Sequence, residues 1–378
     1  MLKTGILTFQ KSLNYGSALQ AWALQEKVCA LGADAELIDY TPDHYADLYG
    51  YLRRVRSAAD LRYDLGNLPF IPLLRRRKKA FQSFWDQRFR LSEQKYAYPE
   101  TPERLNDRYE AIICGSDQIW SSRAKDADVN FFLPIGHKAK KISYAPSLND
   151  GSIADFSPAE DYRRYLSDFD CLSVREADAK ADIEAFLGGS REIAVLPDPT
   201  LLHPKEAFEK IAEPSGLTGA YLLFFSVNYN RMTVRAVKTV ARRTGLPVYF
   251  YFTGSNAKRT ARENKDFHLI RDRLSPACFL DAVKNASMLV CDSFHGTAFS
   301  VIFEKPFFCI ARQAENGGAK RDARICGLLE QLGLSDRFIS EADAETVDLE
   351  TPIDYTGATE KRKAMAEYAE TWLRAALS

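Results

Sequence analysis

The sequence predicts an α/β protein made of two consecutive Rossmann-like domains. Short apolar runs alternate along the chain with segments of helical periodicity, which is the pattern of strands and helices around a parallel sheet. The alternation extends over most of the 378 residues, which is enough chain for two domains of ordinary size. Residues 201–219, which are rich in proline, glycine and serine, interrupt the pattern and indicate the boundary between the domains.

The first half contains the elements of one domain. Its clearest helix is residues 16–31, where one side is apolar and Gly32 follows as a typical helix terminator. We therefore place an N-terminal domain at residues 1–203. Its expected strands are residues 5–9, 35–40, 111–114, 141–145, 171–174 and 193–196.

The second half repeats the pattern and predicts a C-terminal domain at residues 204–357. A last helical segment has no sheet of its own, and we expect a C-terminal helix at residues 358–378 to join the N-terminal domain. The expected strands are residues 221–227, 248–252, 288–291 and 307–311, with helices at 232–244, 275–286 and 324–332 between them.

Residues 45–98 differ from the rest and are predicted to be a helical, basic insertion with little strand pattern. One interpretation of the cationic run at residues 75–79 is a surface that contacts anionic membrane or a charged glycan. The other is a solvated helix whose Phe81, Phe84 and Trp85 face the core. We favour the second because charge runs are usually solvated faces.

Composition narrows the class of protein. With 46% hydrophobic and 27% charged residues, the chain is expected to be soluble and to have a substantial core. The formal net charge of zero argues against a general nucleic-acid binder. There is no signal-peptide pattern, and no apolar run approaches the ~20 residues of a membrane span. Seven scattered cysteines without CxxC spacing favour a reduced, cytoplasmic setting, with peripheral membrane contact left open.

Polar clusters directly follow five of the expected strands. The carboxyl ends of parallel strands meet at one edge of a sheet, so we expect clusters from both domains to converge on one cleft. The clusters contain Asn14, Tyr15, Gly16, Ser17 and Gln20; Gly115, Ser116, Asp117, Gln118 and Trp120; Arg175 and Glu176; Asp198; and Ser293, His295, Gly296 and Thr297.

The turn that carries His295 is the most informative of the five. It connects the expected strand 288–291 to a helical pattern, which places His295 on the first turn of a helix at the sheet edge. Histidine is suited to proton transfer near neutral pH, and the free amides of a helix start attract anions. The alternative is a histidine that only caps the turn.

Arg175 stands at the end of a strand, next to a helix start. Its planar guanidinium matches a carboxylate or a phosphate, which suggests a ligand contact. The alternative is an ion pair with Glu176 or Asp178.

Three further candidates have equally plain alternatives. Asp117 and Asp198 are candidate acceptor-binding or catalytic carboxylates, and the alternative is a turn or helix cap. Trp120 is a candidate for stacking on a sugar ring, and the alternative is that it closes the core.

Common cofactor motifs are absent. The first cluster resembles a dinucleotide-binding unit, but it has one glycine where GxGxxG needs three. GxxxxGK[ST], HExxH and paired-cysteine motifs are also missing, so we expect neither a bound nucleotide cofactor nor a metal.

Taken together and in order, these motifs resemble the polysaccharide pyruvyl transferase family. Each motif is short, but the ordered set is specific and spans roughly residues 4–335, whereas the insertion and the tail carry no diagnostic match. The matching segments are residues 14–20, 115–120, 173–176, 198–201 and 293–297.

The resemblance implies a GT-B-like fold, in which two Rossmann-type domains face each other across a cleft. It also implies an enzyme that transfers a pyruvyl group from the co-substrate phosphoenolpyruvate to a sugar of a cell-surface polysaccharide or its precursor. The product is a cyclic ketal, and phosphate is released. The N-terminal domain would bind the acceptor and the C-terminal domain the donor.

Site roles follow from the resemblance. The family's conserved histidine corresponds to His295, which we assign as general acid/base, and its donor-binding arginine corresponds to Arg175. The amides of Gly296 and Thr297 would support the donor's anion. The loops at residues 14–20 and 115–120, together with Asp198, would present the acceptor.

One position departs from the family. Many members have an arginine two residues before the histidine, where this chain has Ser293. The loss of this cation should weaken donor binding unless another cation replaces it, and the serine also leaves room for a changed donor or reaction within the same fold. Arg321 and Arg324 precede a helix start that suits phosphate, and the alternative for both is a solvent-exposed side chain. The candidate replacements are Arg312, Lys320, Arg321 and Arg324.

Two other functions remain open from the sequence. A glycosyltransferase with a nucleotide-sugar donor would use the same fold, and a non-catalytic glycan-binding protein would need no acid. The acceptor sugar, its lipid-linked or nucleotide-linked carrier and the oligomeric state are left open. No nucleic-acid partner is expected.

Overall fold

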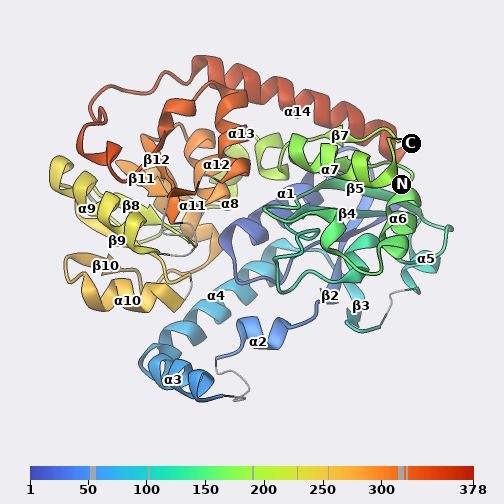
Figure 1. The fold of residues 1–378 in the computed structure, drawn as a ribbon, viewed down its shortest axis with the longest axis horizontal. Helices are drawn as coiled ribbons and strands as arrows, with labels where there is room; N and C mark the ends of the chain where they lie inside the picture. Colours follow the sequence, from blue (N-terminus) through green and yellow to red (C-terminus); the bar gives the residue numbers. More distant parts are fainter. Residues whose placement is uncertain are drawn as a thin grey trace. The chain divides into compact units, whose positions relative to one another are not determined.

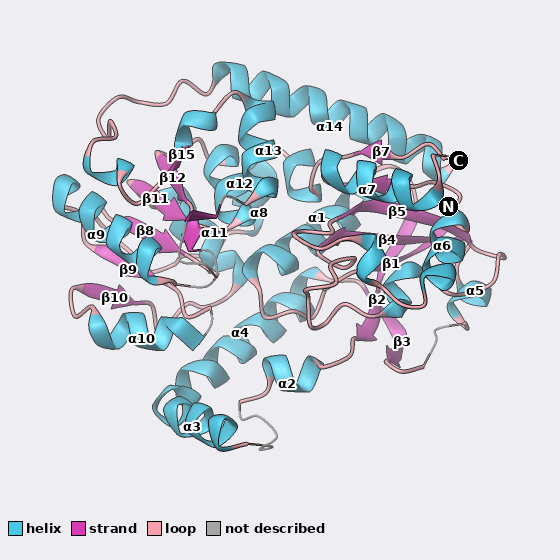
Figure 2. Ribbon diagram, in the orientation of Figure 1, coloured by secondary structure: helices cyan, strands magenta, loops and turns pink. Residues whose placement is uncertain are grey.

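Two parallel β-sheets with surrounding helices organise the chain (Figures 1 and 2). The computed structural model describes residues 1–51, 57–100, 103–189, 191–227, 229–253, 255–313, 319–320 and 322–378. They form two compact units. Unit 1 comprises Met1–His203 and Met365–Ser378, and unit 2 comprises Pro204–Ala364.

Unit 1 contains a five-stranded parallel sheet in the order β3-β2-β1-β4-β5. Its elements are β1 (Lys3–Leu7), α1 (Tyr15–Ala30), β2 (Asp34–Thr41), α2 (Tyr45–Tyr49), α3 (Ala58–Asn67), η1 (Leu68–Phe70), α4 (Ile71–Arg88), β3 (Leu91–Ala97), α5 (Leu105–Arg108), β4 (Ala111–Asp117), η2 (Val129–Phe132), β5 (Lys140–Pro146), η3 (Ile153–Asp155), α6 (Ala159–Ser167), β6 (Ser173–Val174), α7 (Ala177–Leu187), β7 (Ala194–Val195) and η4 (Pro199–Leu202).

Unit 2 contains a six-stranded parallel sheet in the order β10-β9-β8-β11-β12-β15. Its elements are α8 (Lys205–Ile211), β8 (Leu222–Phe225), α9 (Arg231–Thr244), β9 (Val248–Phe250), α10 (Ser255–Glu263), β10 (Phe267–Leu269), α11 (Pro276–Asn285), β11 (Met288–Cys291), α12 (Phe294–Ile302), β12 (Phe307–Ile310), β13 (Arg312–Gln313), β14 (Ala319–Lys320), α13 (Ala323–Leu332), η5 (Ser335–Arg337), β15 (Phe338–Ile339) and η6 (Asp343–Glu345), followed by α14 (Thr356–Leu377), which ends in unit 1.

The strand order reverses once in each sheet. In unit 1 the chain builds β1, β2 and β3 outward to one side and then returns to add β4 on the other side of β1. Unit 2 repeats this arrangement, with β8 at the centre and β11 on its second side. The reversal therefore lies between β1 and β4 in unit 1 and between β8 and β11 in unit 2. This is the doubly wound arrangement of Rossmann-like folds.

Apolar residues of the central strands form the core of each unit. In unit 1, Ile6 on β1 lies opposite Leu37 on β2 and Ile113 on β4, and all three side chains are fully buried. In unit 2, Val290 on β11 has the same relation to Phe224 and Phe308 on its neighbours. These strands are covered on both faces, which explains why they were visible in the sequence as continuous apolar runs.

The edges of the sheets differ from the prediction. The edge strand β3 lies within the insertion, where we predicted little strand structure, and β10 and β15 were also missed. In β3 only Ser92 and Tyr96 are buried, so the strand has no apolar run to reveal it. The first strand also begins and ends two residues earlier than the predicted 5–9.

Most of the insertion is helical, as predicted. In α4 the aromatic side chains Phe81, Phe84 and Trp85 are buried, while Arg76 and Lys79 are exposed. The predicted burial of these aromatic side chains is therefore confirmed, and the exposed cations lie on the other side of the helix. Among the described residues, no helix combines the length and apolar character needed to cross a bilayer.

Candidate functional site

Ligands of doubly wound sheets bind where the strand order reverses, outside the carboxyl ends of the strands. Four of the five predicted polar clusters lie in unit 1 and the His295 turn lies in unit 2. The first two clusters follow β1 and β4, and the His295 turn follows β11. These three clusters therefore lie beside the reversal of strand order in their own unit.

Hydrogen bonds join the first two clusters. The Gln20 side chain donates from Nε2 to Thr8 Oγ1 at 2.8 Å and accepts from the Ser116 amide at 3.3 Å. Ser17 Oγ donates to Asp117 Oδ2 at 2.5 Å. All of these side chains are buried. The two loops that we predicted to present the acceptor therefore form one hydrogen-bonded unit.

Helix α4 of the insertion packs against the first cluster, at Asn14 and Tyr15. Asn14 caps α1 by accepting from the Gly16 amide at 2.9 Å, and Tyr15 packs its ring 4.9 Å from that of Phe81 on α4. Arg77 of α4 stacks over the Tyr15 ring and donates to the main-chain oxygen before Asn14. The position of Asn14 thus depends on α4, a contact that the sequence did not indicate.

Gly115 and Gln118 fix the second cluster. Gly115 has a φ of +132°, and a Cβ atom there would lie 2.0 Å from the Tyr144 carbonyl oxygen on β5, so only glycine fits. The Gln118 amide donates to Asp117 Oδ1 at 2.9 Å. Asp117 therefore accepts from both Ser17 and Gln118, which fixes the direction of its carboxylate.

Trp120 closes the core of unit 1. Its ring stacks on Phe132 at 5.1 Å, its Nε1 donates to the Phe131 carbonyl at 2.8 Å, and it is fully buried. An indole without exposed surface has no face to offer a sugar ring. Trp120 therefore closes the core, and the predicted role of stacking on a sugar ring is wrong.

Arg175 joins the third and fourth clusters through a buried ion pair. Its Nη1 donates to Asp198 Oδ2 and its Nε to Glu176 Oε1, both at 2.9 Å. Burial lowers the pKa of Arg175, but the nearby carboxylates of Glu176, Asp198 and Asp117 outweigh it and raise the pKa above its ordinary value. Asp198 also caps η4 by accepting from the amide and hydroxyl of Thr200.

These contacts change the role predicted for Arg175. We expected its guanidinium to hold the donor, whereas the structure engages it with two internal carboxylates, including the Glu176 partner of the alternative interpretation. Three carboxylates lie near one guanidinium, which leaves an excess of negative charge.

In unit 2, the residues around His295 hold the start of α12. Ser293 is the N-cap: its hydroxyl accepts from the Gly296 amide at 3.4 Å, and its carbonyl accepts from the Thr297 amide at 3.0 Å. A Cβ on Gly296 would lie about 3 Å from Cys291 and Phe225, so glycine allows the helix to approach the sheet. The two amides that we predicted to support an anion are therefore engaged by Ser293.

Arg312 supplies a cation next to the His295 turn. Its Nε donates to the main-chain carbonyl of Asp292 at 3.1 Å, one residue before Ser293. The Asp292 side chain accepts from Ser226 Oγ at 2.7 Å and from the Val227 amide at 3.0 Å, so it joins the ends of β8 and β11. Burial raises the pKa of Asp292, and the Arg312 charge opposes this rise.

Arg324, another of the predicted cations, is less suited to the donor than Arg312. Arg324 forms a two-pronged ion pair with Asp322 at 3.0 and 2.6 Å, and this pairing commits its guanidinium internally. Burial disfavours the Asp322 carboxylate, but the Arg324 and Arg312 charges hold its pKa down at about 2. Arg321 lies outside the described residues.

Several site residues were missed by sequence reasoning. Thr8 is part of the hydrogen-bonded unit around Gln20, and Ser226 orients Asp292. Both lie inside the predicted strands 5–9 and 221–227, whereas the observed strands β1 and β8 end one residue before them, so the predicted strands were too long to reveal these residues. The described residues contain no group of three or more His, Cys, Asp or Glu side chains arranged to hold a metal ion.

Comparison with known proteins gives both a family and a fold. A model of the polysaccharide pyruvyl transferase family matches residues 14–313. Curated proteins give no match to the sequence. Among solved structures, the chain is similar to UDP-GlcNAc 2-epimerase from Methanocaldococcus jannaschii at 13% identity and a TM-score of 0.50, over 97% of this chain and 98% of that chain.

Two further structures have lower TM-scores. UDP-N-acetylglucosamine 2-epimerase from Rickettsia bellii matches 100% of this chain and 97% of its own at 10% identity, with a TM-score of 0.49. E. coli heptosyltransferase WaaC with ADP-2-deoxy-2-fluoro heptose matches 83% of this chain and 90% of its own at 10% identity, with a TM-score of 0.37. At such identities the likeness concerns the fold alone, and the predicted α/β, GT-B-like class is confirmed.

We predict that Asp198→Asn will destabilise unit 1. The substitution leaves the buried guanidinium of Arg175 with one carboxylate partner fewer, and breaking a buried ion pair in this way costs about 3–5 kcal/mol. Urea unfolding followed by circular dichroism would measure the loss. Asp161→Asn is the matched control, because Asp161 forms only an exposed ion pair on α6, and it should change the unfolding free energy by less than about 1 kcal/mol. Equal losses in the two variants would contradict the prediction.

Proposed function

The chain belongs to the polysaccharide pyruvyl transferase family, and we propose that it transfers a pyruvyl group from phosphoenolpyruvate to a sugar of a cell-surface polysaccharide or its precursor. One observation carries the proposal: His295 stands on the first turn of α12, beside the strand-order reversal of unit 2, with the Arg312 cation next to its turn. The family match includes both residues. Phosphoenolpyruvate is a co-substrate in this proposal, and no further cofactor is required.

The proposed reaction defines what the site must supply. Two sugar hydroxyl oxygens form bonds to C2 of phosphoenolpyruvate, and the bond from C2 to the phosphate oxygen breaks. The methylene carbon C3 gains one proton and becomes a methyl group. In net terms, one hydroxyl proton is transferred to C3 and the other leaves with the phosphate, so atoms and charge balance. The site therefore needs an acid at C3 and a cation for the donor's anionic groups.

The residues of unit 2 fit the donor's needs. We assign His295 as the acid that protonates C3 and is then reprotonated by the attacking hydroxyl. Arg312 takes the place of the arginine that many family members have at the position of Ser293. Its Nη1 also lies 3.4 Å from Asp322 Oδ2, but the Arg312 side chain is 25% exposed, against 5% for Arg324, so a ligand has access to it. Ser293 itself orients the turn as the N-cap of α12.

The residues of unit 1 fit the acceptor's needs. The Asp117 carboxylate, with Ser17 and Gln118 around it, is suited to accept hydrogen bonds from sugar hydroxyls. Asn14 and Asp198 belong to the same set of polar clusters. Arg175 acts as a positioning residue, because its ion pairs hold Asp198 and Glu176 in place. A lipid-linked and a nucleotide-linked acceptor both remain compatible with this arrangement.

We also propose a cytoplasmic location with peripheral membrane contact through the insertion. On α3, Leu61 and Leu65 are one helical turn apart and are 49% and 57% exposed. Helix α4 adjoins α3 (Figure 1). It exposes Arg75, Arg76 and Lys79. Exposed leucines beside cations are the combination by which peripheral helices bind anionic bilayers.

Binding of phosphoenolpyruvate is the first test. Phosphoenolpyruvate at ~100 times its dissociation constant should raise the free energy of unfolding by about 2.7 kcal/mol, seen as a higher melting temperature. Arg312→Gln should weaken this binding about tenfold or more, because it removes a charge-assisted contact. Arg242→Gln removes an exposed arginine elsewhere in unit 2 and should bind like the wild type.

The alternatives make opposite predictions in the same assay. A glycosyltransferase would be stabilised by a nucleotide sugar and not by phosphoenolpyruvate. A glycan-binding protein would be stabilised by neither donor, and its sugar binding would survive the loss of both His295 and Arg312. Either result would contradict pyruvyl transfer.

His295→Gln should retain phosphoenolpyruvate binding and lose turnover by about 10²–10⁴-fold, because the substitution removes the acid and keeps the size of the side chain. The measurement is phosphate release from phosphoenolpyruvate with a lipid-linked or nucleotide-linked glycan precursor as acceptor. His268→Gln is the control, since His268 is exposed on β10. Turnover near the wild-type rate in His295→Gln would exclude His295 as the acid.

If the insertion contacts membranes, the protein should co-sediment with vesicles that contain phosphatidylserine. It should co-sediment to a smaller extent with vesicles of phosphatidylcholine alone. Leu61→Gln combined with Leu65→Gln should abolish this binding. Tyr368→Gln, at an equally exposed apolar side chain on α14, should leave it unchanged. Binding that is identical in all three proteins would refute the assignment to α3.

A further inference from the structure

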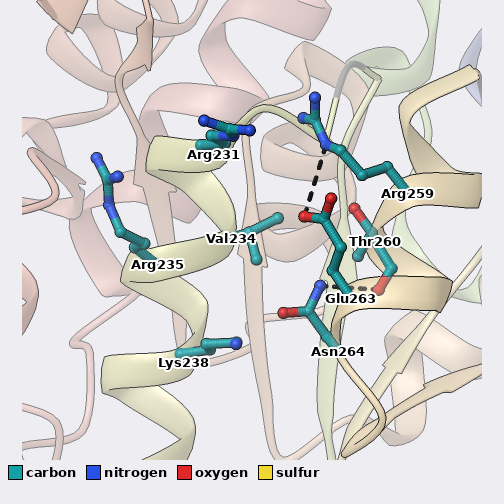
Figure 3. Close-up of a pocket in the computed structure, with 8 residues that line it drawn as sticks. All are labelled: Arg231, Val234, Arg235, Lys238, Arg259, Thr260, Glu263 and Asn264. Carbon is teal, nitrogen blue, oxygen red and sulfur yellow. Dashed lines mark hydrogen bonds and ion pairs between the residues drawn. The ribbon is translucent and has the colours of Figure 1, made fainter.

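A basic pocket lies between α9 and α10 in unit 2, outside the proposed donor and acceptor sites (Figure 3). Its volume is about 300 Å³, which is at the lower end of the range for small-molecule sites. The lining residues are Arg231, Val234, Arg235 and Lys238 from α9, and Arg259, Thr260, Glu263 and Asn264 from α10 and its end.

Positive charge is in excess in this pocket. Figure 3 shows Arg231 and Lys238 extending from α9 toward α10, and Arg259 extending toward α9. One carboxylate, that of Glu263, faces these three cations, and it lies 3.9 Å from Arg259. The fourth cation, Arg235, points away and pairs with a glutamate outside the pocket. The whole chain has a formal net charge of zero, so the excess in the pocket is a local feature.

Two of these cationic side chains have no partner among the described residues. Among the described residues, Arg231 and Lys238 form no ion pair or hydrogen bond through their side chains, whereas Arg242 on the same helix is paired with Glu345. Arg231 and Lys238 are seven residues apart on α9, about 10 Å along the helix axis, and both line the same pocket. A bound anion would neutralise both of them.

A buried hydroxyl gives independent support for a ligand. Thr260 is 2% exposed, and its Oγ1 has no hydrogen-bond partner among the described residues. A buried hydroxyl without a partner costs free energy, and native proteins rarely leave one unsatisfied. Thr260 lines the pocket, so an oxygen-rich ligand, or a water held with it, would supply the missing partner.

We propose that this pocket binds the phosphate of a small phosphorylated ligand. Arginine and lysine are the side chains that proteins use for phosphate, through charge-assisted hydrogen bonds. The volume suits a phosphate with at most one small group attached, such as a second phosphate or a single sugar. The shared chemistry is the phosphate, and a diphosphate and a sugar monophosphate are its two possible sources.

The pocket is separate from the proposed donor site. His295 and Arg312 lie beside the reversal of strand order between β8 and β11. The pocket lies along α9 and α10, which are the helices before and after β9, on the other side of β8 in the sheet. Phosphate bound there would therefore not occupy the place proposed for phosphoenolpyruvate.

Isothermal titration calorimetry of the full chain would test the proposal, with inorganic phosphate, inorganic pyrophosphate and glucose 1-phosphate as probes. Arg231→Gln combined with Lys238→Gln should weaken the binding of the tightest probe by about tenfold or more, because two charged contacts are lost. Lys210→Gln combined with Arg242→Gln is the matched control, since it removes one lysine and one arginine outside the pocket. This control should bind as the wild type does.

The outcomes separate the sources and the sites. Tighter binding of pyrophosphate than of glucose 1-phosphate would support a diphosphate ligand, and the reverse order a sugar monophosphate. Thr260→Val should fold with unchanged or higher melting temperature and bind the probe more weakly. Binding of all probes that is unchanged in both the Arg231/Lys238 and the Thr260 variants would overturn the proposal. The part of phosphoenolpyruvate binding that is lost in Arg312→Gln should be retained in the pocket variants, so the two sites can fail independently.

Discussion

In each unit, the polar groups at the carboxyl ends of two adjacent central strands need hydrogen-bond partners, and side chains supply them. The rest of the site depends on this constraint. Where the strand order reverses, the loops after neighbouring strands leave in different directions, and main-chain and hydroxyl groups remain between them. In unit 1, Gln20 bridges the ends of β1 and β4 through Thr8 and Ser116. In unit 2, Asp292 bridges the ends of β8 and β11 through Ser226 and Val227. The same bonds fix the loops that carry Asp117 and His295.

The candidate sites of the two units differ in charge in the way that the proposed reaction requires. In unit 1, the Asp117 and Asp198 carboxylates and that of Glu176 surround a single buried guanidinium, so the environment favours hydroxyl donors. In unit 2, Arg312 stands beside the His295 turn, so the environment favours an anion. The proposed sugar acceptor and anionic donor would therefore find complementary surroundings in different units.

The sequence was a good guide to the strands that are buried on both faces and a poor guide to side-chain roles. Continuous apolar runs identified β4, β8, β11 and β12, whereas β3 has one half-exposed face and left no such run. Arg175 could not be assigned, because its decisive partner, Asp198, lies 23 residues away in the chain and meets it only in the folded unit. The sequence around Trp120 likewise cannot distinguish a tryptophan that stacks on Phe132 from one that stacks on a ligand. Local periodicity reports burial, and partner choice is a property of tertiary structure.

The double hydrogen bonding of the Asp117 carboxylate has a consequence for recognition. Ser17 and Gln118 hold both oxygens in a fixed direction, and Gly115 allows the strand beneath them to press against β5. Rotamer freedom that a mobile aspartate would lose on meeting a ligand has already been lost during folding. In the proposed acceptor role of Asp117, affinity at this carboxylate would therefore depend on a hydrogen-bonded network that extends through Gln20 to Thr8. Evolutionary selection for ligand binding at Asp117 would then act on every residue of that network, including residues that take no part in the reaction.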